Sequence, residues 1–377
     1  MTTTGILKSP STCLPVERVD ASAYTVPTDA PEADATLAWD STTIVFVEAR
    51  AGGLTGIGWT YAPAATADVV RDQLAPLVEG RDAFDIPSAH VAQCQGVRDA
   101  GRPGIAGCAI SAVDLALWDL KARLMDLPLV RLLGAARDTV PVYGSGGFTT
   151  YHDSHLAAQL SGWVHGQHIT QVKIKVGEAC GRAVPRDLQR VRRARQVIGE
   201  DAELYVDVGG GYNRKQAVRV GDALGTLGVG WFEEPVSSDD LTGLRLVRDT
   251  VVCDVAAGGY GYDLPYFARM IGAGAVDCLQ VDATRCGGIT EFLRAAALAD
   301  AHGLEISAHG APHAHADAAA CAANLRHIEW PHDHVRLESM FFAGVLDPAG
   351  GTVRPGRNGP GNGLVLRSDE VEEYRVT

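Results

Sequence analysis

The fold of this chain is decided by residues 203–235, which read ELYVDVGGGYNRKQAVRVGDALGTLGVGWFEEP. The segment opens with a short β-rich run, ELYVDVG, and passes through a glycine-rich turn. It continues with a stretch in which apolar residues recur at three- and four-residue spacing, and it ends in a second β-rich run, VGWFEEP. This order predicts a strand, a helix and a second strand.

The same plan repeats between about residue 140 and residue 330. Eight β-rich runs follow one another at intervals of about 25 residues: PVYGSGG, QVKIKVG, ELYVDVG, VGWFEEP, VVCDVAAGG, VDCLQVD, LEISAHG and RHIEW. Eight strands that alternate with helices favour a (β/α) barrel. An open doubly wound sheet is the alternative, but its GxGxxG turn is missing, because GSGGFTT does not match that pattern. The first 135 residues predict a separate α+β unit, with hairpin-like runs followed by helices.

Charge and composition argue against several classes of partner. The 377 residues carry a formal net charge of −13, so the field of the protein repels nucleic acids and anionic membranes. The N-terminus lacks the pattern of a signal peptide, and no apolar run reaches about 18 residues, so we expect a cytoplasmic protein. The eight cysteines form no CxxC pair, which favours buried free thiols over disulfides or zinc ligands.

Two lysines on one predicted strand give the first sign of a functional site. In QVKIKVG, Lys173 and Lys175 alternate with β-branched residues, so both lysines lie on one face of the strand. In a barrel the β-branched face turns outward to the helices, and the lysines point inward. An edge strand with solvated lysines is the alternative, but the second strand of a closed barrel has no edge.

Polar residues also stand at the ends of later runs: Asp207 in YVDVGG, Glu233 in WFEEP, Asp282 in LQVDATR and His309 in ISAHG. The carboxyl ends of barrel strands converge on one cavity, and such barrels carry their chemistry there. From Asp207 to Glu233 is a step of 26 residues, and a second step of 26 leads to Gly259. The pattern predicts a carboxylate at that position, where the chain has a glycine instead.

These residue types suit the removal of a proton from a carbon next to a carboxylate. Asp and Glu oxygens hold a hard divalent cation, which stabilises the enediolate that forms. Lysine becomes a base when burial and a neighbouring cation lower its pKa, which we expect for Lys173 and Lys175. We also expect Asp282 to orient the imidazole of His309 as an acid or base on the opposite face of the substrate. A structural histidine is the alternative for His309.

With these residues the chain resembles the mandelate racemase subgroup of the enolase superfamily. The resemblance covers nearly the whole chain and includes ALWDLKARLMDLPLVRLLG, KIK, EEP, DATRCGG and RLE at 336–338. It implies an α/β fold, a modified TIM barrel of (β/α)7β type with an N-terminal α+β capping domain. The expected parts are a disordered or extended tail (1–16), the capping domain (17–135), the barrel (136–339) and a C-terminal segment that packs back on the capping domain (340–377).

The resemblance also implies catalytic roles. Lys175 would be the base on one face of the substrate, and Lys173 would contact the substrate carboxylate. Asp282 and His309 would form the dyad on the other face. Glu338 would form a hydrogen bond with a substrate carboxylate oxygen.

The same resemblance implies an Mg2+ site, with Asp207 and Glu233 as ligands. The family's third acidic ligand follows AAG, and Gly259 stands there instead; Gly209 likewise replaces a common Asn after the strand-three Asp. Two carboxylates can still hold Mg2+ together with water, at reduced affinity. Further substrate contacts are expected from Tyr143, Ser145 and Arg285.

These features predict an Mg2+-dependent dehydratase of a hydroxylated carboxylic acid, an acid sugar, that works by α-proton abstraction. Two alternatives remain open. A racemase or epimerase of a 2-hydroxy acid needs only bases on both faces, and an enolase-like binding protein could have lost its metal through Gly259. The partner in every case is a small carboxylate, and the resemblance implies a homo-oligomer.

Overall fold

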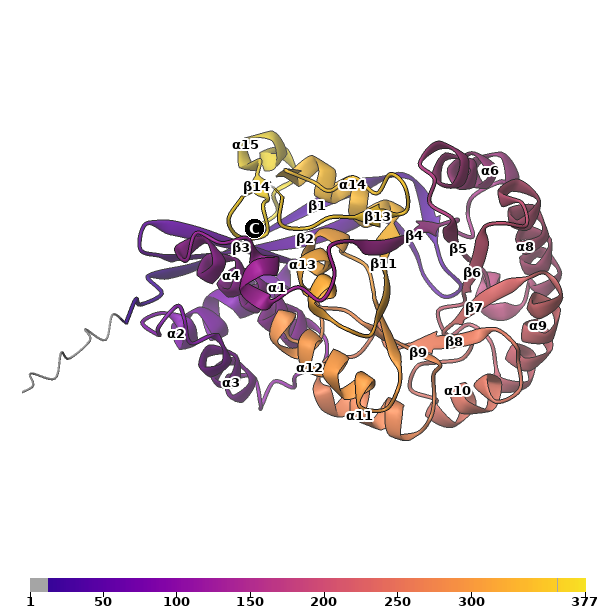
Figure 1. Ribbon diagram of the computed structural model, residues 1–377, viewed down its shortest axis with the longest axis horizontal. Coiled ribbons are helices and arrows are strands. Elements are labelled where there is room, and N and C mark those ends of the chain that lie inside the picture. Colours follow the sequence, from indigo (N-terminus) through magenta and orange to yellow (C-terminus); the bar gives the residue numbers. More distant parts are fainter. Residues whose placement is uncertain (1–12, 358) are drawn as a thin grey trace, which may run out of the picture.

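The computed structural model of the protein describes residues 13–357 and 359–377. A three-stranded sheet with its helices forms the N-terminal part, and a ring of parallel strands surrounded by helices forms the larger part beside it (Figure 1). The predicted fold class, a (β/α)7β barrel with an N-terminal α+β capping domain, is confirmed. A disordered or extended tail was predicted for residues 1–16, and residues 1–12 of it lie outside the described residues. Within the rest, Pro15 forms an isolated β-bridge with Asp82.

The capping domain is built on the antiparallel strands β1 (Arg18–Ala33), β2 (Ala38–Ala51) and β3 (Leu54–Tyr61), in that order. Strand β2 is buried on both faces. Ile44 and Phe46 pack into the core that the barrel shares, whereas Val45 and Val47 pack into the core of the capping domain itself. This two-sided burial explains why the run IVFV at residues 44–47 is apolar without interruption.

Helices cover one face of this sheet, and the longest, α4 (Ile105–Leu124), packs directly on β3. Two glycines make this close approach possible, because a Cβ at Gly58 would lie 2.2 Å from the carbonyl oxygen of Ala112, and one at Gly56 would lie 2.3 Å from that of Ala116. The other helical segments of this domain are α1 (Ala65–Val69), the π-helical turn Val70–Leu74, α2 (Ala75–Val78), α3 (Ile86–Gly96) and α5 (Leu129–Leu133).

Eight parallel strands form the barrel: β4 (Val140–Gly146), β5 (Gln171–Lys175), β6 (Glu203–Asp207), β7 (Val229–Glu233), β8 (Asp254–Ala257), β9 (Cys278–Val281), β10 (Glu305–Ala308) and β11 (Leu325–Pro331). Each pairs with the next, and β11 pairs with β4, which closes the ring. Val172 and Ile174 of β5 pack outward into the main core, whereas Lys173 is turned inward and buried, as the alternation predicts.

The helices that surround the barrel follow the strands in turn: α6 (Asp153–Ser161) with the π-helical turn Gly162–Gly166, α7 (Glu178–Gly181), α8 (Val184–Ile198), α9 (Arg214–Thr226), α10 (Leu241–Arg248), α11 (Leu264–Gly272), α12 (Gly288–Asp300) and α13 (Pro312–Cys321).

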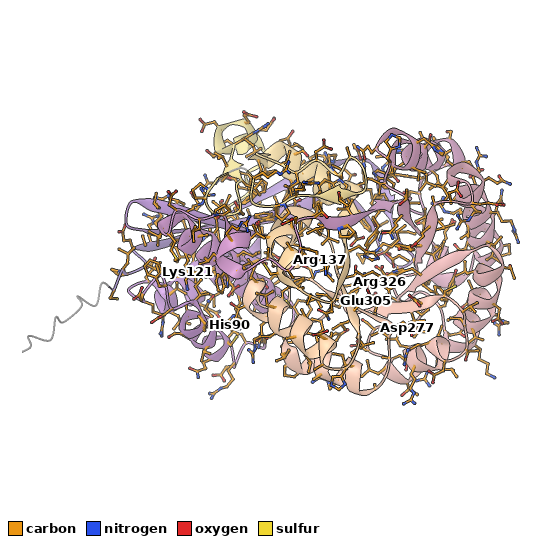
Figure 2. All side chains as sticks on the ribbon, viewed as in Figure 1. His90, Lys121, Arg137, Asp277, Glu305 and Arg326 are labelled. Carbon is orange, nitrogen blue, oxygen red and sulfur yellow. The ribbon has the colours of Figure 1, made fainter. Side chains whose placement is uncertain are left out.

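Ion pairs join the amino ends of several strands on the side of the barrel away from the strand ends that carry the predicted site. Arg326 of β11 bonds to Glu305 of β10 at 2.8 Å and to Asp254 of β8 at 2.7 Å. Asp277, just before β9, accepts a hydrogen bond from Arg248 at 2.7 Å (Figure 2). The charges at this end therefore link strands to each other and to helix α10.

The chain returns from the barrel to the capping domain through α14 (His332–Phe341), which crosses the predicted boundary at residue 340. The remaining elements are β12 (Phe342–Ala343), β13 (Thr352–Val353), β14 (Val365–Leu366), α15 (Ser368–Val371) and the 3-10 turn Glu372–Tyr374. Residues 375–377 then run along β1, where Ala23 donates its N–H to the carbonyl oxygen of Thr377 at 3.0 Å. These last residues cover the outer edge of the capping sheet at Ala23 and Tyr24.

The eight cysteines are all free thiols, and Cys108, Cys253, Cys278 and Cys286 are buried. No helix within the described residues is long and apolar enough to cross a membrane.

Asp317 of α13 gives a testable consequence of this packing. Its carboxylate is 4% exposed and accepts a hydrogen bond from the N–H of Val130 at 3.1 Å. Burial raises the pKa of Asp317 to about 8. Because the folded-state pKa lies above the unfolded value, its contribution to stability is complete at low pH and is lost as the pH rises from about 4 to about 8, by about 5 kcal/mol.

We therefore expect the Asp317→Asn variant, which keeps the acceptor and has no charge, to melt at nearly the wild-type temperature at pH 4 and several degrees higher at pH 8. Thermal unfolding across this pH range measures the difference. Asp222→Asn, at an exposed position, is the control, because its melting temperature should differ from that of the wild type by the same amount at every pH. A constant difference for Asp317→Asn at all pH values contradicts the assignment.

Candidate active site

A cavity of about 290 Å³ opens at the carboxyl ends of the barrel strands, beneath the loop of the capping domain. Four predicted site residues line it: Ser145, Lys175, Arg285 and His309. The capping domain contributes Asp34, Thr36, Leu37 and Trp39 to its wall. The structure thus brings strand ends and capping loop together around one polar space.

The two lysines are paired with carboxylates from other barrel strands, Lys175 on the cavity wall and Lys173 in the buried interior of the barrel. Lys175, Asp207 and Glu233 are the last residues of β5, β6 and β7, and they stand in register across these strands. The Nζ of Lys175 lies 2.7 Å from Oδ2 of Asp207. The Nζ of Lys173 lies 2.7 Å from both carboxylate oxygens of Glu233.

This pairing corrects one expectation from the sequence. Burial by itself lowers the pKa of Lys175, but Asp207 outweighs burial and the charge of Lys173, so the pKa is raised. The pKa of Lys173 is raised as well, because Glu233 and Glu329 outweigh its burial. Both lysines are therefore ammonium groups while Asp207 and Glu233 face them, and the assignment of Lys175 as the base stays a prediction.

Glu329 of β11 is a site residue that sequence reasoning missed. Its Oε1 lies 2.9 Å from Nζ of Lys173, its Oε2 accepts a hydrogen bond from Gly310 at 2.8 Å, and its side chain lines the cavity. The signal was present in the run RHIEW, because the inward–outward alternation used for Lys173 places Glu329 on the inner face of the last strand.

Glu338, which was expected to contact substrate, lies elsewhere. It is buried in α14 and is not part of the cavity wall. Its Oε1 accepts hydrogen bonds from Nε1 of Trp59 at 3.1 Å and the hydroxyl of Tyr61 at 3.3 Å, and its Oε2 lies 2.5 Å from Nδ1 of His313. Glu338 therefore joins the capping domain to the barrel.

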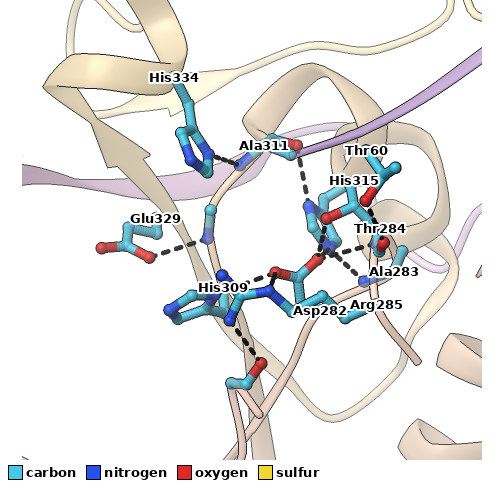
Figure 3. A network of polar contacts seen from close by, with 12 residues as sticks. Thr60, Asp282, Ala283, Thr284, Arg285, His309, Ala311, His315, Glu329 and His334 are labelled. Atoms are coloured by element: carbon cyan, nitrogen blue, oxygen red, sulfur yellow. Dashed lines mark hydrogen bonds and ion pairs between the residues drawn. The ribbon is translucent and has the colours of Figure 1, made fainter. Parts of the chain in front are cut away.

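The predicted pair of Asp282 and His309 is present at the ends of β9 and β10 (Figure 3). Nδ1 of His309 lies 3.1 Å from Oδ2 of Asp282, and since a carboxylate only accepts, Nδ1 carries the hydrogen. Hydrogen bonds from Thr284 to Oδ1 of Asp282, both at 2.7 Å, fix the carboxylate. Burial alone raises the pKa of Asp282, but His309 and Arg285 lower it well below its usual range. Nε2 of His309 is thus left as the basic nitrogen of the ring.

Arg285 lies beside this pair and faces the cavity. Its Nη1 donates a hydrogen bond to the carbonyl oxygen of Gly259 at 2.9 Å, its Nε lies 3.4 Å from Asp282, and its guanidinium stands 5.2 Å from the ring centre of Tyr260. Tyr143, the other predicted substrate contact, is buried inside the barrel, where its hydroxyl lies 3.4 Å from Nζ of Lys173. It does not line the cavity.

Comparison with known proteins places this geometry in a family. The family model described as "Mandelate racemase / muconate lactonizing enzyme, N-terminal domain" matches residues 19–134, and the one described as "Enolase C-terminal domain-like" matches residues 155–371. The chain belongs to the enolase superfamily. Within it, the solved structures that it resembles put it in the mandelate racemase subgroup.

Three relatives show how far the likeness extends. A mandelate racemase/muconate lactonizing enzyme-like protein from Rubrobacter xylanophilus is 47% identical, with a TM-score of 0.92, over 96% of this chain and 100% of its own. A racemase from Streptomyces coelicolor with bound magnesium is 30% identical, with a TM-score of 0.90, over 96% of this chain and 100% of its own. L-talarate/galactarate dehydratase of Salmonella typhimurium is 32% identical over 76% of this chain and 73% of its own. Dehydratases, cycloisomerases and racemases are the enzymes of this group, so the chain is an enzyme of the lyase or racemase kind.

Magnesium is bound in structures of this superfamily, and the barrel of this chain offers an incomplete set of donors for it. Asp207 and Glu233 are buried neighbours on adjacent strands, but the position after β8 is Gly259, which has no side chain. Mg2+ commonly takes only one or two protein carboxylates and completes its shell with water and substrate oxygens. Asp207 and Glu233 therefore fit an Mg2+ ion in a two-carboxylate site.

Glu234, the second acid of EEP, is a further buried carboxyl that sequence reasoning missed. Burial and the charges of Asp207 and Glu233 raise its pKa to about 8, so it is mostly protonated at neutral pH. When protonated, Glu234 adds no third negative charge beside Asp207 and Glu233.

Replacing Lys173 tests the charge balance of the site. We expect Lys173→Met to lower the free energy of unfolding by about 3–5 kcal/mol at pH 7, because Glu233 and Glu329 are left buried without their counter-charge. Urea unfolding measures the change. Lys215→Met, at an exposed position on α9, is the matched control and should change stability little. The double variant Lys173→Met/Glu329→Gln should regain part of the loss, and a loss below about 1 kcal/mol for the single variant contradicts the argument.

Proposed function

We propose that the protein is a dehydratase of polyhydroxylated carboxylic acids, acid sugars, that works by α-proton abstraction. One observation carries this proposal: a histidine oriented by a carboxylate and a lysine ammonium group face the same polar cavity. His309 lies at the end of β10 and Lys175 at the end of β5, three strands apart around the barrel. A substrate between them meets a base on one side and a cationic acid on the other.

The residues suggest the following steps. The ammonium groups of Lys173 and Lys175 attract the substrate carboxylate. Nε2 of His309 takes the α-proton, and the electron pair of the broken C–H bond moves into the carboxylate to give an enediolate, which the two lysines stabilise. The enediolate then expels the β-hydroxyl, which leaves as water with the proton from His309, and the enol product becomes a 2-keto acid.

Mg2+, held by Asp207 and Glu233, would add positive charge next to the substrate carboxylate. Asp282 keeps His309 in the tautomer that leaves Nε2 free, and it stabilises the imidazolium that forms when His309 accepts the proton. Arg285 and Ser145, on the cavity wall, are suited to bind hydroxyl or carboxylate oxygens of the substrate.

The relatives support this substrate class. The Salmonella enzyme dehydrates L-talarate and galactarate by its name, and a structure of a variant of it holds Mg and L-glucarate. An arabinonate dehydratase from Saccharolobus solfataricus, 28% identical over 73% of this chain, belongs to the same kind. Polyhydroxylated acids also suit the polar side of this cavity, which includes Asp34, Thr36 and Asp333.

A racemase or epimerase is the second candidate, because protonated Lys175 could return a proton to the face opposite His309. The products distinguish the two reactions. Incubation with a panel of acid sugars and Mg2+ yields a 2-keto acid for a dehydratase, and an epimer without loss of water for the alternative.

The role of His309 gives the first prediction for the reaction. We expect His309→Asn to lower kcat on the acid sugar that is turned over by about 10²–10⁴-fold, because the α-proton has lost its base. Mg2+ affinity, measured by calorimetry, should stay within about twofold, because His309 contacts neither Asp207 nor Glu233. His302→Asn, at an exposed position after α12, is the control. Full activity of His309→Asn would exclude the histidine as the base.

Gly259 gives the second prediction. An ideal Cβ at Gly259 would lie 2.8 Å from Cδ2 of His309, so any side chain there must displace the ring. We expect Gly259→Glu to bind Mg2+ at least about tenfold more tightly, because a third carboxylate joins the site, but to lose turnover. Gly259→Ala separates the two effects, because it adds the clash without the charge. A large gain of turnover in Gly259→Glu would instead show that glycine at this position disables the active site. That result would support the alternative of an enolase-like binding protein.

A further inference from the structure

A second group of ligating side chains lies outside the barrel site, where the capping domain meets the start of α14 (Figure 1). Asp29 and Glu32 stand near the end of β1, and His332 is the first residue of α14. One ligand atom from each of the three lies within 4.8 Å of the others. It is the one group of three such residues found this close together within residues 13–357 and 359–377.

Glu32 is an unusual member of this group, because it is buried and only half satisfied. Glu32 is 1% exposed, and its Oε2 accepts a hydrogen bond from Nε1 of Trp39 at 2.6 Å. Its Oε1 is also buried and has no hydrogen-bond partner among the described residues. An unsatisfied buried acceptor costs about 1–3 kcal/mol, so this oxygen calls for a ligand.

The charges around Glu32 favour a cation as that ligand. Burial, and then the charges of Asp333 and Asp29, raise the pKa of Glu32 to about 8, and the hydrogen bond from Trp39 and the charge of Arg336 oppose this only in part. Nε2 of His332 lies 2.9 Å from Oδ2 of Asp29, so the imidazole and that carboxylate already face each other. The site therefore combines two carboxylates and one imidazole nitrogen in a region of negative potential.

We propose that Asp29, Glu32 and His332 bind a divalent transition metal ion, Zn2+ by preference, that links the capping domain to the barrel. An imidazole with two carboxylates and an open position for water is a ligand set that suits zinc, whereas Mg2+ prefers oxygen ligands alone. Ligand atoms about 2.0–2.2 Å from a tetrahedral ion are about 3.3–3.6 Å apart, so small side-chain rotations bring the three within range.

Such an ion would act on the active site through Trp39. The indole of Trp39 bonds to Glu32 and lines the cavity, where it also packs edge-on against Phe148. Nearby, Arg336 donates a hydrogen bond to the carbonyl oxygen of Pro27 at 2.6 Å, so β1 and α14 are already in contact. The metal would fix the capping loop, and Trp39 with it, over the cavity.

Calorimetric titration of the whole protein with ZnCl2 tests this assignment, with Co2+ absorption as a second readout of nitrogen and oxygen ligation. With the barrel carboxylates saturated by excess MgCl2, we expect a Zn2+ site that weakens at least tenfold in His332→Gln and in Glu32→Gln. Affinity should be unchanged in His302→Gln, an exposed histidine elsewhere, and in Asp207→Asn, which alters the barrel carboxylates. The melting temperature should rise with Zn2+ in the wild type and not in His332→Gln.

Three results overturn the proposal. The first is the absence of Zn2+ binding in the wild type, which means that Glu32 carries a proton in place of a metal. The second is equal affinity in the wild type, His332→Gln and Glu32→Gln. The third is loss of the site in Asp207→Asn, which assigns the bound Zn2+ to the barrel carboxylates.

Discussion

Lys173 is the charge on which the interior of this barrel depends. Its ammonium group is almost fully buried, yet it contacts Glu233 of β7 and Glu329 of β11, which reach it from different parts of the ring. A carboxylate inside a closed barrel repels any other carboxylate there unless a cation stands between them. With Lys173 in place, Glu233 and Asp207 can sit side by side at the ends of adjacent strands, and the cavity above them can bind an anion.

The barrel and the main strand-end residues could be predicted from the sequence because they depend on local patterns. The alternation of side chains along the strand predicted that Lys173 and Lys175 point inward. The polar residues predicted at strand ends, Asp207, Glu233, Asp282 and His309, lie at the ends of β6, β7, β9 and β10. The pKa of the lysines could not be predicted, because it depends on how near Asp207, Glu233 and Glu329 lie. Those three acids are 32, 60 and 156 residues away from the lysines they contact.

Glu329 and Glu338 show a second limit of the sequence. The motif RLE drew attention to Glu338, but the helix α14 turns that residue toward Trp59 and Tyr61 of the capping domain. Glu329 stands nine residues earlier, on the last strand, where the alternation of strand side chains points it inward. A motif identifies a segment, and the strand or helix that contains it decides which of its residues faces the cavity.

The edge of β1 has a consequence for how the protein is made. Residues 375–377 cover that edge at Ala23 and Tyr24, but 342 positions separate Ala33, the end of β1, from Arg375. On the ribosome, β1 therefore emerges long before residues 375–377, so the N–H and C=O groups of Ala23 that they pair with stay without these partners while the whole barrel is synthesised. Val19 and Ala21 are instead bonded by Glu79 and Arg71 of the capping domain itself. An exposed strand edge pairs readily with other chains, so nascent copies on one messenger are most prone to associate through this sheet during that interval.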